Sequence, residues 1–159
     1  MRADEWRELR ALRLDALANA PGAFVVTHAE ALAYPDERWH EHARRGASAE
    51  TPHFVAAAGD GRFLGMAVGL PTREREDTAA LVAMYVRPEA RRNGIGEALV
   101  ERVLAWARER GFALVELGVA EGNDAAARLY ARCGFVPTGE THRYENAGFE
   151  VDVRMAREL

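Results

Sequence analysis

The chain has 159 residues, one cysteine and a formal net charge of −4, and 48% of its residues are hydrophobic. These values fit a single domain over residues 1–159, and they exclude a disordered chain and a disulfide-stabilised scaffold. The acidic charge argues against a nucleic-acid partner, which needs a basic footprint. No apolar run reaches the roughly 18–20 residues of a membrane span, and the N-terminus lacks a signal peptide's apolar stretch, so we expect a cytoplasmic protein with no membrane partner.

Two helices and a β-hairpin are expected in the N-terminal part. Apolar residues recur every three or four positions over residues 4–18, and a proline and a glycine bound a second helical stretch over 35–45. Two apolar runs, over residues 53–58 and 62–70, flank the turn sequence Gly59-Asp60-Gly61. This pattern predicts a pair of antiparallel strands.

The central part predicts a β-α-β unit. Residues 79–86 include no charged residue, and they predict a strand that is buried on both faces. An amphipathic helix is expected over 96–110, with Gly111 as its C-terminal glycine, and a second apolar strand over 113–119. Because such a crossover joins parallel strands, we expect these two strands to be parallel.

A short helix and a second hairpin are expected at the C-terminal end. The helix begins at Asn123 or Asp124 and ends near Arg132. Apolar and charged residues alternate over 149–155, which predicts a half-buried strand, paired with residues 139–144 through a turn at 146–148. We therefore expect a mixed α/β (α+β) fold, with a mostly antiparallel sheet, one central parallel pair and helices on both faces.

Arginines and glycines lie between the central strand and its helix, in the order Arg91-Arg92-Asn93-Gly94-Ile95-Gly96. A helix start exposes unpaired N–H groups and the positive end of the helix dipole, so a phosphate can bind there. Glycine lets the main chain approach a phosphate oxygen, and arginine adds charge-assisted hydrogen bonds. A P-loop would need Gly-Lys-Ser/Thr, and a dinucleotide fingerprint would need a third glycine; Glu97-Ala98 and Leu99 stand at those positions. An ordinary tight turn is the alternative.

This strand, loop and helix resemble the GNAT superfamily of acyl-CoA N-acyltransferases, whose signature is Arg/Gln-x-x-Gly-x-Gly/Ala after an apolar strand. A second family motif follows, Asn-x-x-Ala-x-x-Leu-Tyr-x-x-x-Gly-Phe. The chain keeps every spacing of it, as Asn123, Ala126, Leu129, Tyr130, Gly134 and Phe135. The resemblance is close over residues 79–137 and looser outside them.

The resemblance implies the acyl-CoA N-acyltransferase fold and a single N-acetyltransferase domain. Such a domain moves an acetyl group from acetyl-CoA, its co-substrate, to a primary amine of a small molecule or peptide by direct attack and without a metal. The main chain of Met84–Val86 would hold the pantetheine arm, and an N–H near Tyr85 or Val86 would polarise the thioester carbonyl. Tyr130 would protonate the departing thiolate as the catalytic acid. The implied coenzyme-binding residues are Met84, Tyr85, Val86, Arg91, Arg92, Asn93, Gly94, Ile95, Gly96, Glu97, Asn123, Ala126 and Tyr130.

The residues leave some alternatives open. Tyr130 is also compatible with a core aromatic, and Asn123 with a plain helix N-cap. A non-catalytic acyl-CoA-binding sensor or interaction module would keep the loop Arg91–Gly96 without needing a proton donor. A homodimer and a longer acyl donor are compatible with the sequence.

The general base is the least defined part of the implied site. Family members that acetylate protein N-termini often carry a glutamate five residues before the motif asparagine, where this chain has Gly118. Glu116 points to the same sheet face and is a candidate base. Glu74, Glu76 and Asp77, or a water chain, are the alternatives. The acceptor is expected near the loops within residues 23–39 and 139–149.

The other reactive side chains are expected to be structural. Cys133 lies near a helix C-terminus, where the dipole disfavours a thiolate. The histidines, including His40 and His42, form no complete ligand set, so no metal is expected. Many family members begin with a strand before the first helix. This chain begins with helix-like sequence, so that strand is expected to be missing, stunted or upstream of the start.

Overall fold

The computed structural model describes residues 1–73, 75–143 and 151–159. Two short 3-10 turns, η1 (Pro21–Ala23) and η2 (Pro88–Ala90), accompany the regular elements. The helices are α1 (Trp6–Asn19), α2 (His28–Leu32), α3 (Asp36–Gly46), α4 (Ile95–Glu109) and α5 (Asp124–Arg132). The strands are β1 (His53–Ala57), β2 (Phe63–Pro71), β3 (Thr78–Val86), β4 (Leu114–Ala120), β5 (Val136–Arg143) and β6 (Val151–Glu158).

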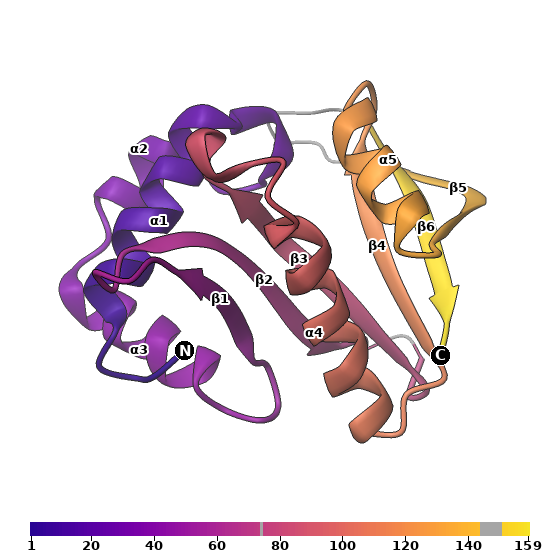
Figure 1. The fold of residues 1–159 in the computed structure, drawn as a ribbon, viewed down its shortest axis with the longest axis horizontal. Helices are drawn as coiled ribbons and strands as arrows, with labels where there is room; N and C mark the ends of the chain where they lie inside the picture. Colours follow the sequence, from indigo (N-terminus) through magenta and orange to yellow (C-terminus); the bar gives the residue numbers. More distant parts are fainter. Residues whose placement is uncertain (74, 144–150) are drawn as a thin grey trace.

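The strands form one six-stranded sheet in the order β1-β2-β3-β4-β6-β5 (Figure 1). Its pairs are antiparallel except for β3 and β4, which are parallel and are joined through α4. The structure therefore confirms the mostly antiparallel sheet with one central parallel pair. Residues 1–5 precede α1 without forming a strand, so the described chain has no strand before its first helix.

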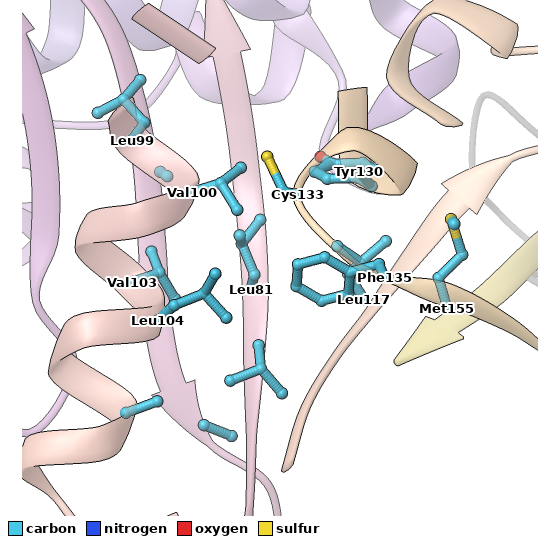
Figure 2. Close-up of a cluster of buried hydrophobic side chains, with 14 of the residues drawn as sticks. Leu81, Leu99, Val100, Val103, Leu104, Leu117, Tyr130, Cys133, Phe135 and Met155 are labelled. Carbon is cyan, nitrogen blue, oxygen red and sulfur yellow. The ribbon is translucent and has the colours of Figure 1, made fainter. Parts of the chain in front are cut away.

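The sheet separates two hydrophobic cores, which confirms helices on both faces. The α4 core lies between the sheet and α4 with α5, and Figure 2 shows part of it; its members include Leu81, Leu99, Val103, Leu104, Leu117, Tyr130 and Phe135. The α1 core lies on the other face under α1 and α3; its members include Trp6, Leu9, Leu12, Leu17, Trp39 and Met66. Successive strand residues point to opposite faces, and accordingly Met66 lies in the α1 core and Ala67 in the α4 core.

A glycine follows the last turn of α4, the helix after β3, and another follows the last turn of α5, the helix after β4. Gly111 has φ 78°, and the N–H of Phe112 donates to the carbonyl of Ala107 at 3.0 Å. Gly134 has φ 80°, and the N–H of Phe135 donates to the carbonyl of Tyr130 at 3.0 Å. This pattern is the Schellman motif, which needs a left-handed residue after the helix. It fixes the direction in which the chain leaves α5 beside Tyr130.

Two expectations about burial were wrong. Residues 79–86 were expected to be buried on both faces, yet Val82 is 38% exposed, because β3 pairs with β4 only over Thr78–Ala80. A half-buried strand over 149–155 would expose its charged side chains, yet Asp152 is only 3% exposed. The reason is that β6 lies between β4 and β5 inside the sheet. Residues 149 and 150, and the turn expected at 146–148, lie outside the described residues.

The helix α2 was not anticipated, although its start has a local sequence signal. The Thr27 hydroxyl accepts from the N–H of Glu30 at 3.2 Å, and the Glu30 carboxylate accepts from the N–H of Thr27 at 2.8 Å. This reciprocal arrangement is a capping box. It orders the segment between α1 and α3, which covers one side of the sheet.

Candidate active site

The two parallel strands separate after their first residues and leave a cavity between them. Thr78–Ala80 pair with Leu114–Glu116, and beyond this short register β3 and β4 no longer pair. The cavity has a volume of about 940 Å³. Main-chain edges from both strands face it, because neither edge is covered by a ladder partner there. It is lined by Asn19, Ala20, Ala23, Leu81–Val86, Arg91, Arg92, Gly94, Gly96, Glu97, Gly118–Ala120, Asn123, Ala125, Ala126, Leu129, Tyr130, Arg132 and Asp152.

A β-bulge redirects the β3 edge beside the cavity. Ala83 has φ 54°, and the register with β2 shifts opposite it, between Met66 and Val68. A left-handed alanine costs roughly 1–2 kcal/mol, so the surrounding pairing must hold it in place. The bulge bends the strand just before Met84–Val86 and turns their main chain relative to a regular ladder.

The side chain of Tyr85 belongs to the other face of the sheet. Its ring is buried in the α1 core, and its hydroxyl donates to Asp15 Oδ2 at 2.7 Å. Burial, followed by this hydrogen bond, raises the pKa of Tyr85 to about 12. What Tyr85 offers to the cavity is therefore its main chain.

The N-terminus of α4 opens on the cavity. Its N-cap, Gly94, has φ 76° and makes no side-chain cap, and the first helical bond runs from Ala98 N to Gly94 O at 3.0 Å. The N–H groups of Ile95, Gly96 and Glu97 precede that bond and have no partner within the helix. Together with the positive end of the helix dipole, these unpaired donors give the helix start the properties that favour a bound anion.

The arginines before α4 take different positions. Arg91 Nε donates to the carbonyl of Val86 at 3.0 Å, so its guanidinium lies along β3. Arg92 is exposed, has φ 64° and lines the cavity. Asn93 and Ile95, which were also expected at the site, do not line the cavity: Asn93 Nδ2 donates to Ala90 O at 3.5 Å, and Ile95 packs against the α4 core. The Ile95 contribution is thus limited to its main chain.

The helix α5 forms the opposite wall. Asn123 Oδ1 accepts from the N–H of Ala126 at 3.2 Å, so Asn123 caps the helix, and it also lines the cavity. A Cβ added at Gly96 would stand 3.1 Å from Leu129 Cδ2, so a glycine there lets α4 and α5 approach closely. Glu97 Oε1 accepts from Arg132 Nε at 2.8 Å, which adds a surface ion pair between the two helices.

Tyr130 lies at the boundary between the α4 core and the cavity. It is 5% exposed, lines the cavity and packs edge-on against Phe135 with the ring centroids 5.9 Å apart (Figure 2). Burial raises the pKa of Tyr130 far above its ordinary value. The phenol therefore keeps its proton throughout the neutral range, as a proton donor must.

The far end of the cavity is formed by groups that the sequence did not bring together. Asn19, the last residue of α1, and Ala20, its C-cap, line the cavity. Ala23 is the one residue of the expected acceptor segment 23–39 that lines it. Residues 139–143 do not line it, and 144–149 lie outside the described residues. Asp152 lines it from β6. No local sequence signal marked Asp152, because its burial depends on the pairing of β6 between β4 and β5.

Three of the expected candidates for a base, Glu116, Glu76 and Asp77, do not line the cavity. Glu116 Oε1 accepts from Arg154 Nη2 at 2.8 Å, and Glu116 is absent from the lining. Glu76 and Asp77 precede β3, at the end where the strands are still paired. Glu74 lies outside the described residues.

Other reactive groups stand apart from the cavity. Cys133 is buried, and burial raises the pKa of its thiol, which favours the protonated form. Over residues 1–73, 75–143 and 151–159, no group of three or more His, Cys, Asp or Glu side chains is arranged to hold a metal ion. In the same part of the chain, no helix has the length and apolar character to cross a bilayer.

Known proteins are similar to this chain in sequence and in fold. The model of the acetyltransferase (GNAT) family matches residues 7–135. An uncharacterized N-acetyltransferase of Mycobacterium tuberculosis is 35% identical over 105 residues, which are 66% of this chain and 66% of that protein. The alignment thus spans just under two thirds of that relative.

Solved structures superpose over the whole described fold. A ribosomal-protein-alanine N-acetyltransferase of Brucella melitensis has a TM-score of 0.74 at 26% identity, with 100% of this chain and 97% of that chain covered. A putative acetyltransferase of Salmonella typhimurium, solved with its cofactor acetyl-CoA, has a TM-score of 0.78 at 18% identity, with 100% and 91% covered. These likenesses show the fold, and the family match over residues 7–135 establishes that the chain belongs to the acetyltransferase (GNAT) family.

Proposed function

We propose that this chain transfers an acetyl group from acetyl-CoA to a primary amine by direct attack, without a covalent acyl-enzyme. The observation that carries this proposal is the cavity between β3 and β4, with the open N-terminus of α4 at one end. An acyl-CoA has the matching shape: a diphosphate, a long amide-bearing arm and a thioester. Membership of the family and the acetyl-CoA bound to the Salmonella typhimurium protein support the same ligand.

The diphosphate is assigned to the α4 end. The N–H groups of Ile95, Gly96 and Glu97 point out of the helix start, and the exposed Arg92 adds a positive charge beside them. Gly94 and Gly96 leave the main chain accessible to a phosphate oxygen. These groups recognise charge and shape, and they need no base-specific or ribose-specific contact.

The pantetheine arm is assigned to the gap between the strands. The main-chain edge of Met84–Val86 has no strand partner on the β4 side, and it offers hydrogen bonds to the amides of the arm, as an added strand would, beside the Val86 carbonyl that accepts from Arg91. Asn123 and Ala126 bound the gap from α5. The thioester then comes to lie near the bulge at Ala83, where a main-chain N–H of Tyr85 or Val86 would stabilise the oxyanion.

Tyr130 is assigned the role of proton donor to the departing thiolate. Its burial keeps the phenol protonated, and it reaches the cavity from the α5 side. Cys133 has no such role, because its thiol is buried and is absent from the cavity lining.

Two measurements test this function. Isothermal titration calorimetry is expected to show one acetyl-CoA bound per chain, and mass spectrometry of an amine panel incubated with acetyl-CoA is expected to show acetylated products 42 Da heavier, about the mass of the added C₂H₂O. Tight coenzyme binding without any acetylated amine would favour a coenzyme sensor instead. Absence of binding would contradict both functions.

A further inference from the structure

The proposed reaction needs a group that removes a proton from the acceptor. An alkylamine is protonated near neutral pH, and only its neutral form has the lone pair that attacks a thioester. Among the described residues that line the cavity, the carboxylates are Glu97 and Asp152. Glu97 lies at the diphosphate end and is paired with Arg132 at 2.8 Å. Asp152 is thus the carboxylate at the other end.

Asp152 lies on the sheet face that is opposite the α4 core. In β4, Leu117 and Val119 belong to the α4 core, so Gly118 between them faces the other way. A Cβ added at Gly118 would stand 2.0 Å from Asp152 Oδ2 and 2.7 Å from its Cγ. The carboxylate therefore occupies the space in which a side chain at position 118 would lie.

This placement gives Gly118 a specific role. The position was noted in the sequence because a carboxylate there would serve as a base. In this fold, β4 leaves the space empty at residue 118, and β6 fills it with the carboxylate of Asp152. The carboxylate thus reaches the gap between β3 and β4 from a strand that is distant in sequence.

The charged and titratable groups around Asp152 come from its own strand, β6, and from the neighbouring strands β4 and β5. Arg154 Nη1 lies 3.8 Å from Asp152 Oδ2, and Arg154 Nη2 donates to Glu116 Oε1 at 2.8 Å. His142 of β5 is the register partner of Asp152, so its side chain lies on the same face. The lining residues contributed by the N-terminal segment are Asn19, Ala20 and Ala23, which carry no charge.

We propose that Asp152 holds the acceptor's ammonium group at the α1 side of the cavity and takes its proton before attack. This inference rests on the proposed acetyl transfer. Because Asn19, Ala20 and Ala23 carry no charge, the carboxylate is the charged recognition element at this end of the lining, and the acceptor class is a primary alkylammonium. Arg154 positions the Asp152 carboxylate, because its guanidinium is held by Glu116 through one nitrogen and lies beside Asp152 Oδ2 with the other.

The proton and bond changes balance. The ammonium passes one proton to Asp152, and the nitrogen forms a bond to the thioester carbonyl carbon. When the C–S bond breaks, the thiolate takes the proton of Tyr130, and the second proton lost by the nitrogen restores the phenol through solvent. The proton on Asp152 then leaves to solvent. One proton is released for each amide and thiol formed.

The test is the pH dependence of acetylation in Asp152→Asn, which keeps the shape of the side chain and removes its charge. We expect kcat/KM for an alkylamine at pH 7 to fall by about 10²-fold or more, the usual contribution of a general base. The gap to the wild type should narrow as pH rises, because the free amine becomes abundant without a base. Acetyl-CoA affinity should remain within about twofold, since the coenzyme groups are untouched. Glu158→Gln, which removes an exposed carboxylate from the same strand, is the matched control.

Gly118→Ala is the second variant, and it covers the case in which Asp152→Asn does not fold. Its methyl group displaces the carboxylate but leaves the charge in the chain. The same pH-dependent loss is expected. A rate within threefold of the wild type at pH 7 in either folded variant, or a loss that does not change with pH, would overturn the role of Asp152 while leaving acetyl transfer intact. A wild-type chain that acetylates no amine overturns the transfer itself, and this inference with it.

Discussion

The two ends of the cavity are built in different ways. The end proposed to hold the coenzyme is formed by short continuous stretches, residues 91–97 and 123–130, and it offers mainly main-chain N–H groups. The end proposed to hold the acceptor is formed by single residues from α1, β4 and β6, which are far apart in sequence, and it offers a side-chain carboxylate. A main-chain site follows from local turn and helix geometry, whereas a side-chain site depends on which strands the topology places next to each other.

The largest effect is expected from Tyr130→Phe, which removes one oxygen atom at the junction of the two ends. Because the thiolate then leaves without a positioned proton donor, kcat should fall by about 10²–10³-fold, with acetyl-CoA affinity unchanged. Steady-state kinetics with calorimetry would measure both. Tyr34→Phe, in the segment between α2 and α3, is the control and should retain the wild-type rate. Full activity of Tyr130→Phe would assign that residue to the core alone.

The face of the sheet under α1 and α3 is expected to be the acid-sensitive one, because His53 lies there against the end of α3. Burial, as the largest cause, lowers the pKa of His53 to about 4. The unfolded chain binds this proton below about pH 6.5, so stability is complete above that pH and falls as pH drops towards 4, by up to about 3 kcal/mol. Helices α4 and α5 contain no histidine. Urea unfolding at pH 7, 5.5 and 4.5 should show a smaller loss for His53→Gln than for the wild type. Equal losses would contradict the assignment.

A third expectation separates affinity from stability at the coenzyme end. Gly94→Val places a β-branched residue at φ 76°, which strains the loop by roughly 1–3 kcal/mol and moves the α4 N–H groups. Acetyl-CoA affinity should fall by about tenfold or more, as measured by calorimetry. Gly111→Val carries the same kind of strain at φ 78°, at the other end of α4. That control should lose stability and keep its affinity; equal affinities in both variants would contradict the role of the loop.

The smallest effect is expected from Glu97→Gln. If the main chain of residue 97 binds the diphosphate, the side chain is dispensable, and its ion pair with Arg132 is exposed and weak. Acetyl-CoA affinity should stay within about fivefold of the wild type, since an exposed pair contributes at most about 1 kcal/mol. A loss as large as that of Gly94→Val would mean that the carboxylate itself is part of the site.

The contrast between a site built from local main chain and a site built from distant side chains also explains which features the sequence could predict. The β3-α4-β4 unit, the loop before α4 and the Asn123 cap were predictable, because each depends on neighbours within a few residues. The exposure of Val82 was not predictable, because it results from β3 and β4 separating after three register pairs. Asp152 was missed for a related reason: its strand alternates like a surface strand, and only the order β4-β6-β5 places it inside the sheet.

The central claim is that a diphosphate binds at the start of α4 while the acyl arm lies between β3 and β4. A crystal structure of the chain with acetyl-CoA tests it most directly. The expected result is phosphate oxygens within about 3.2 Å of the N–H nitrogens of Ile95, Gly96 or Glu97, with the thioester beside Met84–Val86. A coenzyme bound elsewhere, with both the α4 start and the gap between the strands empty, would contradict the account.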